Sequence, residues 1–319
     1  MRFKINFNRT TRQRMLPMDY QYYVSAWVYK VLRQADREFA RFLHERGYGQ
    51  SDTKLYKLFC FSRLNFGKPV LWKERKLFEI SRHEISLLVS FDVPEAASTF
   101  VKGLFVNQEF FLGDKFNGID LKVSGVEVLP EPAFRTTMHY RLQTPWVVSC
   151  QAVNDRNPQY LSPADDGFDQ LAIKHLLEKY KNTRNAEDIG PEQVGLKRRA
   201  GFKRAGFVIK PGTPAQTRVV GNLFDFELTA PVELHRMIWS AGVGEKSASG
   251  FGWVELSPVG LEPGLDRNSR GLNRNRRELH REGGSPLRNA CGLDRNTVGS
   301  HRNAPGSERN ERGLDQNDN

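Results

Sequence analysis

The sequence predicts an α+β protein in which two tandem ferredoxin-like domains, each β-α-β-β-α-β and RRM-like, precede a disordered C-terminal heptad-repeat tail. Three observations lead to this fold class. The apolar pattern runs through the β-α-β-β-α-β order twice. The 319 residues suffice for two domains of ordinary size. The composition changes completely from residue 264 onward. The expected limits are 1–130, 133–258 and, for the tail, 264–319.

The first domain opens with a strand, because residues 2–7 alternate polar and apolar side chains. A long helix follows, capped by Asp19 and ended by Gly47, since apolar residues recur between them at steps of three and four. The same periodicities predict the remaining elements, which are a strand at 54–64, a strand at 83–91, a helix at 95–105 and a strand at 119–129.

The second domain repeats this order after a short linker at 130–132. Its expected elements are a strand at 134–142, a helix at 166–180, a hairpin of 199–209 with 217–228, a helix from 231 and a strand at 251–256. A glycine-rich stretch therefore lies between the last helix and the last strand of this domain.

The tail consists of heptads such as GLDRNSR and GLNRNRR. These heptads lack the two apolar seams of a coiled coil. They also contain too few large apolar residues to bury a core, so we expect disorder. A heptad without a structural reason suggests a tandem DNA repeat translated as an extension of the gene. The alternative is an Arg-rich tail that binds RNA.

The net charge of +11 predicts a polyanionic partner, with nucleic acid before a membrane surface. No apolar run approaches the ~20 residues that span a bilayer, and the first residues lack a signal-peptide core. We therefore expect a cytoplasmic protein. The cysteines are scattered and the histidines show no ligand spacing, which predicts neither a metal nor another cofactor. No pattern indicates the oligomeric state.

The stretch Gly-Val-Gly-Glu-Lys-Ser-Ala-Ser-Gly-Phe-Gly at 242–252 is the most specific motif. Glycines at positive φ with exposed N–H groups, beside a lysine, can cradle phosphate oxygens. The P-loop and the dinucleotide fingerprint are excluded by their spacing and by their strand-loop-helix order. The predicted phosphate contacts are Gly242, Gly244, Lys246, Ser247, Gly250 and Gly252. The alternative interpretation is a flexible connector.

Two basic stretches accompany this glycine-rich stretch. One covers residues 2–14, and the other lies near the hairpin and contributes Arg198, Arg199, Lys203 and Arg204. Together with the glycines they predict one phosphate-binding face. For any single charge, the competing interpretation is ordinary solvated surface.

His44 lies three residues before the glycine that ends the first helix. Periodicity alone favours a helix C-terminal cap for this residue. Tyr29 is fifteen residues upstream, on a similar side of a straight helix but about 22 Å away along its axis. A site shared by the two residues therefore requires the helix to break between them.

Three motifs occur in one order: Leu-His-x-x-Gly-Tyr at 43–48, Tyr-Leu-Ser-Pro-x-Asp at 160–165, and the glycine-rich stretch. Together they resemble the CRISPR-associated repeat-cleaving endoribonucleases of Cas family six, in the RAMP superfamily, over residues 1–256. The resemblance implies two ferredoxin-like domains and metal-independent cleavage of CRISPR repeat transcripts into guide RNAs. Attack of the 2′-hydroxyl on the adjacent phosphate would leave 2′,3′-cyclic phosphate and 5′-hydroxyl ends. The implied partner is CRISPR repeat RNA, with other CRISPR-associated proteins of an effector complex as further candidates.

The resemblance also implies catalytic residues, since His44, Tyr29 and Lys54 match the family's histidine, tyrosine and lysine. Lys57 is an equal candidate for the lysine. A histidine moves protons near neutral pH, a lysine stabilises the charged phosphorane, and a tyrosine orients the nucleophile or shares the proton transfer. Should His44 prove not to be catalytic, His235 is the next candidate.

Two binding functions compete with the enzyme. A non-catalytic RAMP subunit would keep the glycines and the basic face without needing the histidine. A tandem RRM protein would need an aromatic RNP1 strand, and the nearest candidate, at 204–208, lacks most of that motif.

Overall fold

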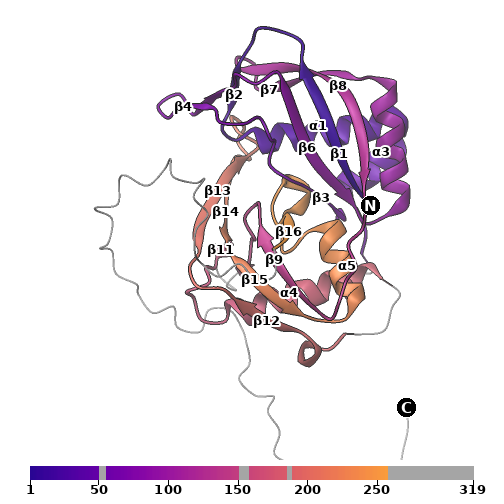
Figure 1. Ribbon diagram of the computed structural model, residues 1–319, viewed down its shortest axis with the longest axis vertical. Coiled ribbons are helices and arrows are strands. Elements are labelled where there is room, and N and C mark those ends of the chain that lie inside the picture. Colours follow the sequence, from indigo (N-terminus) through magenta and orange to yellow (C-terminus); the bar gives the residue numbers. More distant parts are fainter. Residues whose placement is uncertain (50–54, 151–157, 185–188, 258–319) are drawn as a thin grey trace, which may run out of the picture.

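The computed structural model describes residues 1–49, 55–150, 158–184 and 189–257. The predicted tail at 264–319 and the candidate catalytic Lys54 lie outside these residues. The described chain forms an upper and a lower domain that meet along a seam (Figure 1). Among the described helices, none has the length and apolar character needed to cross a bilayer.

The first domain is built on an antiparallel sheet of order β3-β6-β1-β8-β7. Its strands are β1 (Arg2–Arg9), β3 (Phe59–Phe61), β6 (Glu84–Phe91), β7 (Glu109–Gly113) and β8 (Gly118–Leu129). Without β7, which the sequence did not predict, the spatial order is that of a ferredoxin-like unit. Helices α1 (Tyr20–Ala35) and α3 (Pro94–Val106) close the core on one face. A smaller sheet contains β2 (Met15–Pro17), β5 (Leu77–Glu79) and β4 (Val70–Trp72).

The predicted continuous first helix at 19–47 is wrong, because the chain breaks at Asp36. Asp36 has an extended backbone and accepts a hydrogen bond from Phe39 N at 2.9 Å, so it caps a separate helix, α2 (Arg37–Glu45). Apolar residues are buried on both sides of the break. The apolar periodicity therefore runs through the break and conceals it in the sequence.

The second domain repeats the same topology with the order β12-β15-β9-β16, which confirms the tandem ferredoxin-like prediction. Its strands are β9 (Thr137–Leu142), β12 (Gly195–Arg198), β15 (Asp225–Thr229) and β16 (Val254–Leu256). Helices α4 (Phe168–Thr183) and α5 (Val232–Ala241) contribute to its core. The short pair β10 (Ser149–Cys150) and β11 (Gln159–Tyr160) and the turns η1 (Pro191–Gln193) and η2 (Ser247–Ser249) complete it.

The predicted hairpin is longer than expected and bent. Its base consists of β12 and β15 and belongs to the main sheet. Beyond the bend, β13 (Lys203–Ile209) and β14 (Thr217–Leu223) pair with each other as an arm. The arm rises toward the first domain (Figure 1), where Val208 N donates to Asp19 Oδ1 at 2.8 Å. The sequence located this hairpin but assigned its arm to the main sheet, whereas the arm forms a separate two-stranded sheet. The Asp19 side chain binds the arm and does not cap α1 as predicted.

Arg2, at the start of β1, joins the two domains. Its guanidinium lies between the rings of Trp239 and Trp253, 3.3 and 4.0 Å from their centroids. It also donates to the Trp239 and Val254 carbonyls at 2.8 and 2.9 Å. Arg2 is 3% exposed, and burial lowers its pKa to about 9. It therefore belongs to the interior, as does Arg9, which removes these two arginines from the phosphate-binding face predicted for the basic stretch at 2–14.

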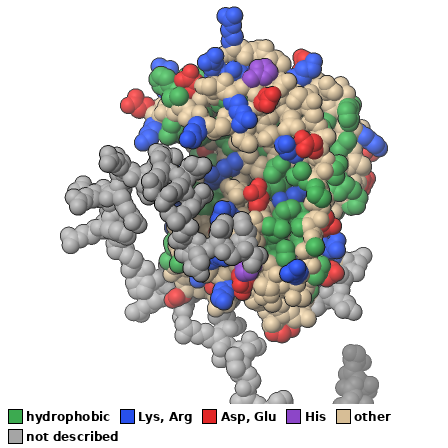
Figure 2. Space-filling model, viewed as in Figure 1, with side chains coloured by type: hydrophobic (Ala, Val, Ile, Leu, Met, Phe, Trp, Pro, Cys, Tyr) green, Lys and Arg blue, Asp and Glu red, His purple; other side chains and the backbone are tan. Residues whose placement is uncertain are grey.

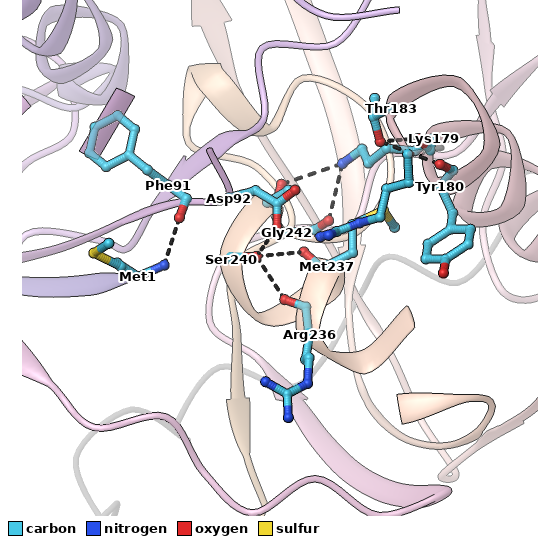
Figure 3. A network of polar contacts seen from close by, with 12 residues as sticks. Met1, Phe91, Asp92, Lys179, Tyr180, Thr183, Arg236, Met237, Ser240 and Gly242 are labelled. Carbon is cyan, nitrogen blue, oxygen red and sulfur yellow. Dashed lines mark hydrogen bonds and ion pairs between the residues drawn. The ribbon is translucent and has the colours of Figure 1, made fainter. Parts of the chain in front are cut away.

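A polar network continues this seam (Figure 3). Asp92, just after β6, accepts a hydrogen bond from Ser240 of α5 at 2.5 Å and pairs with Arg184 at 2.6 Å. Lys179 of α4 is buried and donates to the Gly242 carbonyl at 3.1 Å, just beyond the end of α5. The start of the glycine-rich stretch is thus held by a buried cation.

The buried ammonium group of Lys179 should make stability depend on alkaline pH. Burial lowers the pKa of Lys179 to about 8 from 10.5, against the opposing charges of Cys60, Asp92 and Glu245. Between these two pKa values the unfolded chain holds more protons than the folded one, so this group makes stability rise with pH. Wild type should therefore gain stability relative to Lys179→Met between pH 8 and 10.5, measured as urea midpoints at a series of pH values.

Lys174→Met provides the matched control, because Lys174 is an exposed lysine on the same helix. Its profile should run parallel to that of wild type. Parallel profiles for Lys179→Met as well would show that Lys179 does not titrate in this range.

Candidate active site

Tyr29 of α1 and His44 of α2 lie together in the structure. Their ring centroids are 4.9 Å apart with planes at 83°, an edge-to-face contact. The break at Asp36 turns α2 back against α1 and removes the separation that a straight helix would impose. The Tyr29 ring also contacts the ring of Phe59 in β3, with 5.5 Å between the two ring centroids. Two residues that the sequence linked only through a helix break are therefore neighbours.

The two rings differ in their surroundings. His44 is exposed, whereas Tyr29 is half-buried. Burial raises the pKa of the Tyr29 phenol above its usual value of 10. At neutral pH this hydroxyl therefore stays protonated and can donate a hydrogen bond, while the exposed imidazole can reach a substrate from solvent.

Lys57 fastens the end of α2 and hence the position of His44. Its ammonium nitrogen donates to the His44 carbonyl at 2.7 Å and to the Arg46 carbonyl at 3.0 Å. Gly47, at φ +83°, packs against the same segment, where a Cβ would lie 2.6 Å from the Tyr56 carbonyl oxygen. Lys57 is thus engaged as a helix cap. The choice between Lys54 and Lys57 as the catalytic lysine stays a prediction, because Lys54 lies outside the described residues.

A surface groove with a volume of about 580 Å³ opens beside the two rings. Its charged lining residues are Lys30, Arg33, Arg37, Arg41, Glu38 and Glu45. Sequence reasoning missed the four basic residues. The available signal was their spacing of three and four residues, which places such side chains on one helix face.

Close packing explains the glycines at 242–252. A Cβ on any of the four would lie within 3.0 Å of a neighbouring atom, and all four have positive φ. The facing atoms are Cys60 Sγ for Gly242, Trp146 Cδ1 for Gly244, the Phe61 ring for Gly250 and the Val243 carbonyl oxygen for Gly252. The stretch is therefore a packed loop rather than a flexible connector. Contact between these glycines and RNA phosphates stays a prediction.

Residues 242–252, which we call the glycine loop, also lie next to the ring pair formed by Tyr29 and His44. Ser25 Oγ of α1 donates to the Ala248 carbonyl at 2.7 Å, and Ser25 is one helical turn before Tyr29. Lys246 is exposed in the left-handed conformation, at φ +59°, whereas Ser247 is buried. Of the loop's predicted polar contacts, Lys246 is the one that is open to a ligand.

The basic residues near the hairpin divide into two groups. Arg198 pairs with Asp169 at 2.7 Å and donates to the Pro163 carbonyl, and Arg204 donates to the Tyr160 carbonyl at 3.0 Å. These two anchor the Tyr-Leu-Ser-Pro segment. Arg199 and Lys203 are exposed and make no ion pair within the described residues. On the face shown in Figure 2, Lys and Arg side chains are interspersed with Asp and Glu.

Two family sequence models match most of the described chain. Residues 15–123 match CRISPR-associated protein Cas6, N-terminal, and residues 129–256 match CRISPR-associated protein Cas6, C-terminal. This chain belongs to the Cas6 family. The CRISPR-associated endoribonuclease Cas6 of Pyrococcus furiosus is 25% identical over 258 residues, covering 80% of this chain and 90% of that protein. The CRISPR-associated endoribonuclease Cas6 1 of Methanocaldococcus jannaschii is 23% identical over 248 residues, covering 75% and 87%.

Solved structures share the fold of this Cas6 chain. A Cas6-related protein of Pyrococcus furiosus superposes with a TM-score of 0.67 at 20% identity, covering 82% of this chain and 99% of that one. A RAMP protein that binds different RNA substrates gives a TM-score of 0.66 at 19% identity, covering 81% and 100%.

His235, the next catalytic candidate after His44, is buried in this Cas6 chain. Its Nδ1 lies 2.9 Å from the Tyr140 hydroxyl and its Nε2 lies 3.2 Å from the Thr136 carbonyl. The Nε2–H therefore donates to the carbonyl and Nδ1 accepts from the phenol. Burial lowers the pKa of His235. Both nitrogens are engaged inside the core, which removes His235 as an alternative.

The described residues contain no group of three or more His, Cys, Asp or Glu side chains that could hold a metal ion.

Glu245, inside the glycine loop, is engaged with Ser149 Oγ at 2.9 Å and with His175 Nδ1 at 3.3 Å. These contacts fasten the loop to β10 and α4 within its own domain.

The packing role of the loop glycines predicts a difference between two alanine substitutions. Gly250 and Gly212 both have positive φ, but a Cβ at Gly250 meets the buried Phe61 ring at 2.5 Å, whereas nothing lies within 4 Å at Gly212. Backbone strain costs about 1–2 kcal/mol at either position, and overpacking adds about 1–3 kcal/mol at Gly250. Gly250→Ala should therefore unfold at a clearly lower urea concentration than Gly212→Ala. Equal losses at both positions would show that the Phe61 contact is not tight.

Proposed function

We propose that this Cas6 protein cleaves CRISPR repeat transcripts into guide RNAs as a metal-independent endoribonuclease. The observation that carries the proposal is the contact between the exposed His44 imidazole and the Tyr29 phenol beside a groove lined with lysine and arginine. Family membership supports the same activity, because the relatives from Pyrococcus furiosus and Methanocaldococcus jannaschii are both named endoribonucleases. Cytoplasmic location and work alongside other CRISPR-associated proteins are parts of this proposal.

The chemistry requires few groups because RNA supplies its own nucleophile. The 2′-oxygen attacks the adjacent phosphorus, the bond from phosphorus to the 5′-oxygen breaks, and the products carry 2′,3′-cyclic phosphate and 5′-hydroxyl ends. His44 takes the proton of the 2′-hydroxyl, and the resulting imidazolium returns a proton to the leaving 5′-oxygen. No net proton is consumed in this sequence.

Tyr29 and Lys54 complete the proposed site. The Tyr29 hydroxyl, kept protonated by the raised pKa, donates to a phosphate oxygen and orients the scissile group. Lys54 neutralises the additional negative charge of the phosphorane. Lys57 acts through the backbone of α2 and holds His44 in place.

Substitution of His44 tests the proposed function directly. His44→Ala should lose about 10²–10⁴-fold in single-turnover cleavage rate, which is the usual worth of general acid–base catalysis. The affinity for repeat RNA should barely change, because phosphate contacts elsewhere supply it. Rates are measured with labelled repeat RNA in EDTA, and the ends are identified by phosphatase and kinase treatment.

Further variants separate the roles within the site. Tyr29→Phe removes only the hydroxyl and should slow cleavage less than His44→Ala, while Lys54→Ala should slow it and Lys57→Arg should preserve it. Wild-type cleavage by His44→Ala would show that the site is misassigned. Tight repeat binding with no cleavage by wild type would favour a non-catalytic RAMP subunit.

Lys246 tests the glycine loop separately from catalysis. If its ammonium contacts one phosphate of RNA, Lys246→Ala should reduce the slope of log affinity against log salt by about one unit or slightly less. The measurement is fluorescence anisotropy of repeat RNA carrying 2′-deoxyribose at the cleavage site. An unchanged slope would restrict the loop to its packing role.

A further inference from the structure

The groove beside Tyr29 and His44 continues away from them. A second hollow of about 600 Å³ is lined by Lys30, Arg33, Gln34, Arg37 and Val106. It shares Lys30, Arg33 and Arg37 with the hollow that contains the two rings. The two hollows therefore adjoin each other at these three side chains, and together they extend from the ring pair to the end of α3. We call the two adjoining hollows together the basic groove.

The cations of the basic groove form no ion pair within the described residues, although Glu38 and Glu45 also line the groove. Lys30, Arg33, Arg37 and Arg41 are all exposed, and none of them makes an ion pair or side-chain hydrogen bond within the part of the chain that the structure describes. Other exposed cations do have partners. Lys122, for example, lies 3.1 Å from Glu109. Grouped like charges that form no ion pair repel one another, and they favour the binding of a polyanion.

The placement of these cations follows from the same helix break that brings the two rings together. Lys30 and Arg33 occupy the last turns of α1, and Arg37 lies at the start of α2. The break therefore gathers the cations of both helices at the corner between them. A ligand with several phosphates can follow this corner outward from His44.

We propose that the basic groove binds the RNA backbone on one side of the scissile phosphate, so that at least two flanking phosphates contact Arg33 and Arg37. This inference rests on the proposed function, since His44 marks the scissile position. The groove recognises phosphates and not base edges, so it fixes the register of the RNA without reading its sequence. At the far end, Val106, which is 63% exposed, offers an apolar contact to a base.

Equilibrium binding of a non-cleavable repeat RNA, with 2′-deoxyribose at the scissile nucleotide, tests the groove without depending on catalysis. Arg33→Gln and Arg37→Gln should each weaken binding about tenfold at low salt, as expected for loss of a charged hydrogen bond. Each should also reduce the log–log salt slope by about 0.7 for a single strand. Lys122→Gln is the matched control and should change neither quantity, because Glu109 already neutralises that lysine.

RNAs truncated on the 5′ or 3′ side of the scissile phosphate then locate the contact. The effect of Arg33→Gln and Arg37→Gln should vanish with the RNA that lacks the flank held in the groove, and persist with the other. If the effect persists with both truncated RNAs, the arginines contact only the scissile phosphate and the flank proposal is overturned. If Arg33→Gln and Arg37→Gln leave affinity and salt slope unchanged, as Lys122→Gln should, while the wild-type protein cleaves repeat RNA, the groove proposal is overturned and the endoribonuclease proposal stands. Reduced slopes in a protein that never cleaves would leave the groove in place and reject the endoribonuclease.

Discussion

The close contact between the glycine loop and the first domain is the constraint on which the candidate site depends. Gly250 lies against the Phe61 ring of β3, and Ala248 accepts a hydrogen bond from Ser25 of α1. The Gly250 contact leaves no room for a side chain, because a Cβ would lie 2.5 Å from the Phe61 ring. Since β3 also carries Phe59 and α1 also carries Tyr29, the two elements in these contacts with the glycine loop are the two that hold the tyrosine ring. Domain packing and the geometry of the site are therefore coupled.

The break at Asp36 is the second determinant, and its cause is local. An aspartate in an extended conformation offers its carboxylate to the first amides of α2, which is worth about 1 kcal/mol to a helix end. The free energy is small, but it decides whether His44 lies next to Tyr29 or about four turns away. At the other end of α2, Lys57 and Gly47 fix the helix against the next segment. A short helix held at both ends presents His44 in one orientation.

The sequence predicted the β-α-β-β-α-β order of elements in both domains and the place of the glycine loop, because these features appear as periodicity and as a specific motif. It missed the break at Asp36 because core residues on both helices keep the same three- and four-residue steps. It also read Arg2 as surface, since a charged residue is rarely buried. The partners of Arg2 are tryptophans more than 200 positions away, and no local pattern encodes such a contact. The pairing of Tyr29 with His44 could therefore be proposed only through a family resemblance, whereas the structure shows the two rings in contact.

The fold, and not the local sequence pattern, determines which basic residues are available to bind phosphates. Part of the basic excess lies inside the molecule, where Arg2 is enclosed by indole rings and Lys179 by backbone carbonyls. Another part is neutralised on the surface, as Arg198 is by Asp169. Phosphates can gain most from cations that are exposed and lack a carboxylate, because no existing ion pair must first be broken. Within the described residues the corner between α1 and α2 and the tip of the glycine loop meet this condition, as do Arg199 and Lys203 near the hairpin. The placement of such cations is therefore a better guide to a phosphate-binding surface than the net charge.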